Sequence, residues 1–192
     1  MTLLILGLVL FLGVHSTRIF AEGWRTSFIA SRGPMAWKGL YTVVSLIGFA
    51  LIIWGYGQAR LDPVVLWSSP RWTRHLAALL VLLALVLLMA TYVPGNGIKA
   101  RLHHPMVLSV KVWAAAHLLA NNTLADVLLF GGFLVWAVLN FRAARGRDRA
   151  NGTVYAPGRA GPTVLTVVLG LVVWAVFAFW AHAALFGVRP FG

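Results

Sequence analysis

The chain has 192 residues, of which 60% are hydrophobic and only 10% are charged, and its net charge is +12. A soluble domain carries about a quarter charged residues, so this composition excludes a water-soluble globular protein. The Lys and Arg residues lie between apolar runs rather than along one helix face, which argues against nucleic-acid binding and favours contacts with membrane lipids. There is no Cys, which excludes disulfides and thiolate ligands.

Six apolar runs predict an all-α, polytopic integral membrane bundle of about six transmembrane helices. In chain order the predicted spans are residues 2–20, 40–58, 74–92, 105–121, 124–142 and 163–186. The fourth run is the weakest by hydropathy, so a five-span arrangement, with this run re-entrant or peripheral, is the alternative. We expect a single transmembrane domain over residues 1–192, with a basic loop at residues 143–162.

The basic residues are divided unevenly between the loops. The first, third and fifth loops hold eleven Lys and Arg residues, whereas the second loop and the C-terminus hold four. By the positive-inside rule, the odd-numbered loops face the cytoplasm and both termini face the opposite side.

The fourth predicted span carries His117 near its middle. An ionisable group at membrane depth is costly and marks a functional site by default. At helical spacing His117 shares a face with Trp113, Ala114 and Asn121, which leaves space for a flat ligand. An interhelical hydrogen bond to Ser or Thr is the alternative interpretation. Lys111 lies about 120° around the helix, and we expect it to snorkel to the cytoplasmic end.

The first predicted span carries a second histidine, His15, in its inner half. At ~1.5 Å per residue, His15 and His117 each fall within about 6 Å of the membrane midplane. Two imidazoles at similar depths could ligate one iron from opposite faces, although the spacing permits this without requiring it. Arg18 and Glu22 follow His15 at a spacing that predicts an i,i+4 ion pair at the interface.

The other four histidines are weaker candidates for a site. His182 stands alone as a polar group in its part of the last span, so it is a further candidate. We expect His75 to be interfacial. His103 and His104 precede Pro105, which suits the first turn of a helix, and we expect them to cap that helix or contact head groups.

Five short motifs are distributed along the chain: Val14-His15-Ser16 with Arg18, His104-Pro105-Met106, Trp113-x3-His117-Leu-Leu-Ala-Asn121, Leu129-Phe-Gly-Gly-Phe133 and Leu185-Phe-Gly-Val-x-Pro190. Together they resemble the NnrU family of bacterial membrane proteins over essentially the whole chain. That family takes its name from an association with nitrite and nitric oxide reduction in denitrifying bacteria. The resemblance therefore implies the bacterial inner membrane, where the orientation predicted from the basic loops makes both termini periplasmic.

The NnrU family is similar to zeta-carotene isomerase, a membrane enzyme that uses haem b to isomerise a cis double bond in a linear polyene. The haem-ligating histidines of the isomerase lie in a His-Ser motif and in the helix after a His-Pro motif, which match His15 and His117 here. The isomerase also has a Cys one turn before the second histidine, where this chain has Ala114. A switch to a thiolate ligand is therefore excluded.

Three function hypotheses follow from the resemblance. The first is a haem-b-binding membrane protein, ligated by two histidines, with a redox, sensing or isomerase-like role linked to denitrification and a redox or reductase partner. The second is a haem-free assembly or interaction factor for nitrogen-oxide reductases. The third is an isomerase or transferase acting on an isoprenoid or polyene lipid. The residues expected around the haem are His15 and His117 as metal ligands, Trp113, Ala114, Asn121, Arg18 and Lys111, with His182 and His104 as further candidates.

Overall fold

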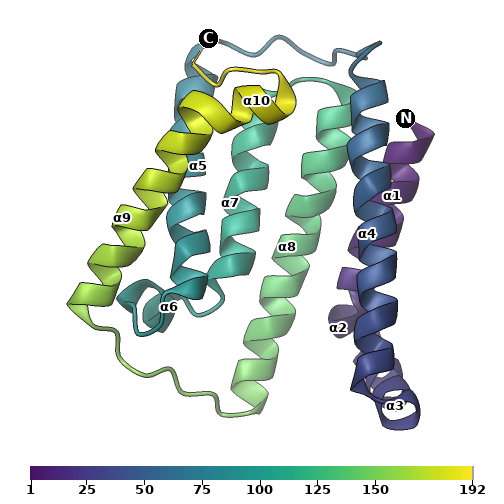
Figure 1. Cartoon of the computed structure of the whole chain (residues 1–192), viewed down its shortest axis with the longest axis vertical. Coiled ribbons are helices and arrows are strands. Elements are labelled where there is room, and N and C mark those ends of the chain that lie inside the picture. Colours follow the sequence, from purple (N-terminus) through teal and green to yellow (C-terminus); the bar gives the residue numbers. More distant parts are fainter. Residues whose placement is uncertain (192) are drawn as a thin grey trace. The chain divides into compact units, whose positions relative to one another are not determined.

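The computed structural model describes residues 1–191, and these residues form helices joined by turns and loops (Figure 1). Within this range there is no strand, only two isolated bridges. The chain separates into two compact units that share helix α8 (Leu124–Ala150). The first unit holds Met1–Trp67 and Asn122–Ala143, and the second holds the remaining described residues. The prediction of an all-α chain is confirmed.

Four helices within residues 1–191 are long and apolar enough to cross a bilayer. They are α4 (Pro34–Ala59), α5 (Trp72–Tyr92), α8 and the C-terminal segment Ala160–Phe186. Two shorter apolar helices, α1 (Thr2–His15) and α7 (Pro105–Ala120), account for the other two predicted spans. The prediction of a multi-pass membrane protein with about six membrane helices is confirmed.

Apart from α1, helix α7 is the shortest of the helices that match the predicted membrane spans. At ~1.5 Å per residue its 16 residues extend about 24 Å, which is less than the roughly 30 Å of the hydrocarbon core. Both a short full crossing and a re-entrant helix agree with this length. Pro105 occupies the first turn of α7, as the sequence predicts.

In the first unit, α1 packs along α4 through contacts that only glycine allows. A Cβ atom added to Gly7 or Gly48 would lie 2.6 or 2.7 Å from a backbone nitrogen of the facing helix. A Cβ atom on Gly55 would lie even closer to the backbone nitrogen of Leu4. Small residues let membrane helices approach closely where lipid offers no hydrophobic driving force, so these glycines define the α1–α4 seam.

The first predicted span is wrong at its end, because α1 stops at His15 instead of continuing to residue 20. The hydroxyls of Ser16 and Thr17 donate to carbonyl oxygens of the preceding turn at 2.6 and 2.9 Å, and such bonds compete with the helix ladder and bend helices. The chain continues as α2 (Thr17–Phe20) and α3 (Glu22–Arg32). Helix α3 was not predicted, because it is amphipathic and lacks an apolar run.

In the second unit, α5 packs against both α7 and α9 (Ala160–Val176) (Figure 1). The indole Nε1 of Trp174 donates to the carbonyl oxygen of Ala78 at 3.0 Å. A Cβ atom on Gly170 would lie 2.6 Å from the side chain of Val86. Here too, a glycine brings two membrane helices together.

Other bounds also differ from the sequence prediction. Helix α8 continues to Ala150, so the first part of the basic segment 143–162 is helical rather than loop. The last span contains a π-helical turn, η1 (Phe177–Ala181), before α10 (His182–Phe186); π-turns are rare and recur at functional sites. The short helix α6 (Gly97–Leu102) was not predicted, because six residues carry too little periodicity.

Candidate functional site

His15 is the last residue of α1, and aromatic rings of the first unit surround its imidazole. Its ring stacks on Phe11 with centroids 4.1 Å apart, and it lies 5.0 Å from the Tyr41 ring and 6.1 Å from the Trp136 ring. Its Nδ1 lies 2.6 Å from the carbonyl oxygen of Phe11. Because a carbonyl oxygen can only accept, Nδ1 carries the proton, and the lone pair of the neutral ring is on Nε2.

His117 lies in the last turn of α7 and repeats this arrangement. Its Nδ1 lies 2.9 Å from the carbonyl oxygen of Trp113, which again assigns the lone pair of the neutral ring to Nε2. The Trp113 ring lies 5.0 Å away, and the side-chain amide of Asn121 donates to the His117 carbonyl oxygen at 2.8 Å. Trp113 and His117 therefore lie one turn apart on α7, whereas Asn121 is the extended residue that follows the helix, and the role of these three residues around a ligand stays a prediction. Ala114 is fully buried, and its place beside a haem stays a prediction.

His15 and His117 belong to different units. His15 is the last residue of α1 and His117 lies in the last turn of α7, so His117 is not at the middle of its helix as the sequence predicts. Their pairing, and the matching depth on which it depends, stay predictions.

His182 begins α10, immediately after the π-helical turn, and has the same kind of hydrogen bond. Its Nδ1 lies 2.7 Å from the carbonyl oxygen of Val188. The rings of Phe177 and Phe186 lie 6.5 and 5.1 Å from the imidazole, at steep angles. His182 therefore remains a further candidate ligand within the second unit.

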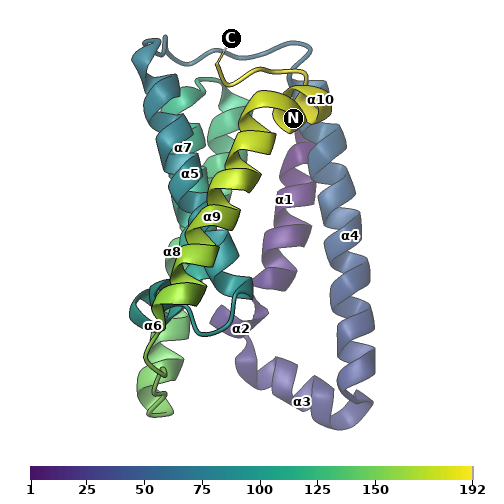
Figure 2. The ribbon, with the colours of Figure 1, turned by 60° about the vertical axis from the view of Figure 1, so that its left-hand side comes forward.

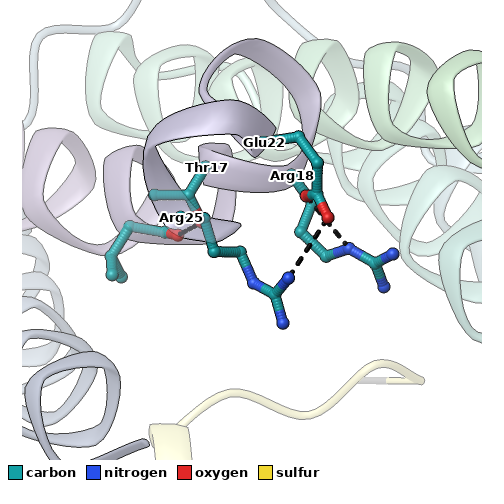
Figure 3. A network of polar contacts seen from close by, with 5 residues as sticks. Thr17, Arg18, Glu22 and Arg25 are labelled. Atoms are coloured by element: carbon teal, nitrogen blue, oxygen red, sulfur yellow. Dashed lines mark hydrogen bonds and ion pairs between the residues drawn. The ribbon is translucent and has the colours of Figure 1, made fainter. Parts of the chain in front are cut away.

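The predicted ion pair between Arg18 and Glu22 is present, with an N–O distance of 3.4 Å (Figure 3). Glu22 also pairs with Arg25 at 3.1 Å, so one carboxylate holds two guanidinium groups at the start of α3. Lys111 is half-buried on α7. Contacts of Arg18 and Lys111 with haem propionates stay predictions.

His104 is the N-cap residue of α7, as expected, but its side chain makes no capping bond. Instead, its Nε2 lies 2.8 Å from a carboxylate oxygen of Asp148. The hydroxyl of Tyr155 donates to the same oxygen at 3.0 Å, and the His103 ring stacks on Tyr155 with centroids 4.0 Å apart. Burial and, next, the hydrogen bond to Asp148 raise the pKa of Tyr155, so its hydroxyl stays protonated at neutral pH and donates.

We did not single out Asp148 from the sequence, because it stands in a basic run and its histidine partner is 44 residues away. The cluster of His103, His104, Asp148 and Tyr155 joins the start of α7 to the end of α8 and the segment that follows. Since the Nε2 atom of His104 faces a carboxylate, we leave His104 out of the ligand set that we propose.

Tyr41 and Trp136, which flank His15, were also missed. They lie on α4 and α8, far from His15 in the sequence, so no helical periodicity connects them to it. The indole Nε1 of Trp136 is buried and has no hydrogen-bond partner among residues 1–191. Buried indole N–H groups normally have an acceptor, so the environment of His15 contains an unused hydrogen-bond donor.

No group of three or more His, Cys, Asp or Glu side chains suited to a bare metal ion occurs in the described part of the chain. A haem iron requires fewer ligands from the protein than a bare metal ion does, because the porphyrin supplies four nitrogens and the protein supplies only the axial ligands. An imidazole held through Nδ1 presents its Nε2 lone pair in a fixed direction. The surroundings of His15 fit a haem edge, because they combine flat aromatic rings with the unused donor of Trp136.

A protein-family model described as NnrU protein matches residues 3–190 of the chain. The match therefore extends over both compact units. None of the curated proteins and none of the solved structures matches the chain.

Proposed function

The chain belongs to the NnrU family, and we propose that this membrane protein binds haem b, with His15 and His117 as axial ligands, in a redox role linked to denitrification. One observation carries the proposal: the Nδ1 atom of each ring donates to the carbonyl oxygen four residues earlier. Metal-ligating histidines almost always donate their other ring N–H to such a partner, which fixes the tautomer and the ring direction.

A haem in this position would supply one-electron chemistry. With His15 and His117 both holding the iron, no ligand position would remain open for a substrate, which would favour electron transfer or sensing over catalysis at the metal. The rings of Phe11 and Tyr41 would exclude water from one side of the site. The guanidinium of Arg18, three residues after His15, would pair with a propionate. A redox protein or a nitrogen-oxide reductase of the same membrane would be the electron partner.

We also propose that the membrane is the bacterial inner membrane and that the odd-numbered loops face the cytoplasm. The excess of Lys and Arg in those loops supports this orientation. Helix α3 and the Asp148 cluster would then lie on the cytoplasmic side.

The visible spectrum of the purified protein tests haem binding. We expect a Soret band, with sharp α and β bands on reduction, in the unchanged chain. Replacing either proposed ligand, by His15→Ala or His117→Ala, should abolish the sharp reduced α and β bands, because iron held by a single imidazole has an open position and loses the spectrum of the bis-histidine form. His75→Ala is the matched control, since His75 is exposed on α5, and it should keep the full spectrum.

Three results would contradict the proposal. A well-folded, colourless preparation that takes up no added haemin would exclude haem binding and favour an assembly factor. Loss of the spectrum in only one of the two histidine variants would exclude the bis-histidine pair, and the same test on His182→Ala would then identify the second ligand. A haem protein that converts a supplied cis-polyene would indicate an isomerase rather than an electron carrier.

The unused donor of Trp136 leads to a second expected result. Trp136→Phe should keep the aromatic packing near His15 but weaken haemin binding about fivefold, because one hydrogen bond contributes about 1 kcal/mol. Titration of the haem-free protein with haemin measures this affinity. Trp54→Phe is the control, because the Trp54 ring is largely exposed on α4. Equal affinities for the two variants would show that the Trp136 N–H contacts no haem atom.

A further inference from the structure

Helix α3 runs across the end of α4, at a steep angle to both α1 and α4 (Figure 2). The reversal occurs at Gly33, whose φ of 84° and ψ of 160° favour glycine. Because α4 is long and apolar enough to cross a bilayer, a helix that lies across its end follows the membrane surface. Amphipathic helices in this position bury their apolar side at the boundary between head groups and acyl chains.

An aromatic cluster fixes α3 to α4. The Trp37 ring of α4 is only 7% exposed, and the rings of Trp24 and Phe28 meet it edge-on at 5.8 and 5.9 Å. Trp24 itself remains 54% exposed. Tryptophan rings that are half covered by protein are typical of the membrane interface, where one edge is apolar and the other is wet.

The charges around α3 are strongly unbalanced. The segment from residue 18 to residue 38 carries four basic side chains and one acidic side chain, Glu22. Glu22 is already shared by Arg18 and Arg25, as Figure 3 shows, and Arg25 also lies over the Trp37 ring. Arg32, by contrast, forms no hydrogen bond or ion pair with residues 1–191. Its guanidinium therefore has donors to offer.

An open groove on α3 places Arg32 beside hydroxyl groups and aromatic walls. The groove has a volume of about 440 Å³, and its lining residues are Trp24, Ser27, Phe28, Ser31 and Arg32. The guanidinium and the hydroxyl of Ser27 are donors that match phosphate oxygens. The two aromatic rings offer apolar contact to a glycerol backbone and the first carbons of acyl chains.

We propose that this groove binds the phosphodiester head group of an anionic phospholipid, such as phosphatidylglycerol, from the leaflet on which α3 lies. Arg32 contacts the phosphate, Ser27 donates a hydrogen bond, and Lys38 of the second turn of α4 adds positive charge. The positive surroundings disfavour the choline cation of phosphatidylcholine, which gives the groove its selectivity. This inference uses the membrane location and the geometry of α3, and it does not depend on haem binding.

The test uses the full-length chain in mild detergent and measures binding of short-chain phosphatidylglycerol by native mass spectrometry. Short-chain phosphatidylcholine and free glycerol phosphate are the comparison ligands. We expect phosphatidylglycerol to bind more tightly than either, and Arg32→Gln to weaken that binding about tenfold, the loss expected for a charge-assisted contact. Arg189→Gln removes one exposed positive charge from the other unit and should leave the affinity unchanged.

Three results would overturn the proposal. Equal binding of the two lipids would exclude selectivity for an anionic head group. Equal weakening by Arg32→Gln and Arg189→Gln would indicate general attraction by net charge. Binding of glycerol phosphate as tight as that of the lipid would indicate a site for a soluble phosphate ester. If Arg32→Gln impairs folding, Ser27→Ala replaces it, and an unchanged affinity in that variant counts against the groove.

Discussion

Gly55→Ala should lower the free energy of unfolding of the first unit by about 3 kcal/mol, at the upper end of the usual cost of overpacking. The added methyl group would meet the backbone of Leu3 and Leu4 on α1 rather than the flexible end of a side chain. Backbone atoms cannot rotate away, so α1 must move off α4. The same seam positions His15, since that residue ends α1, and its shift should also weaken haemin binding.

Gly57→Ala is the matched control for this result. Gly57 lies two residues further along the same helix, and a Cβ atom there would meet no atom within 4 Å. Alanine is the better helix former by about 1 kcal/mol, so Gly57→Ala should be neutral or stabilising. Unfolding in mixed detergent and dodecyl sulfate, followed by tryptophan fluorescence, compares the two variants. Equal stability of both would show that α1 and α4 do not pack through Gly55.

Asp126→Ala should destabilise the same unit by about 4 kcal/mol, because it leaves buried donors without an acceptor, at about 1–3 kcal/mol each. Asp126 is only 5% exposed, and its carboxylate accepts a hydrogen bond from the Tyr56 hydroxyl at 2.5 Å. It also accepts the backbone N–H and the hydroxyl of Thr123, at 2.9 and 2.6 Å. These bonds close the start of α8 against α4, next to a backbone bond from the N–H of Leu124 to the carbonyl oxygen of Val64.

A double-mutant cycle isolates the contact between Tyr56 and Asp126. Tyr56→Phe alone should cost about 2 kcal/mol, the value of a hydrogen bond to a charged group, and it should cost little once Asp126→Ala is present. Asp62→Ala is the control, since Asp62 is exposed in the loop after α4 and loses the same charge. Additive effects in the cycle would show that the two side chains do not interact.

The membrane class, the approximate number of spans and the family were readable from the sequence alone. A bilayer requires helices of about 20 apolar residues, so composition along the chain predicts the spans without knowledge of any partner. The ion pair of Arg18 and Glu22 was predictable from their separation of four residues, and it forms even though the helix is interrupted at Ala21 between them. The two histidines of the proposed site came from spacing and from the family motifs.

The contacts that decide packing needed the tertiary structure, because their members are distant in the sequence. The sequence does not distinguish Gly55 from other helix residues, and only the structure shows that the backbone of Leu4 packs against it. Tyr56 and Asp126 are 70 residues apart, and Trp136 joins the surroundings of His15 from another helix. Helix α3 has too few apolar residues to predict from hydropathy, and its position across the end of α4, on which the proposed lipid site rests, needed the structure. Local composition thus determined which segments enter the membrane, whereas tertiary packing decided which side chains meet there.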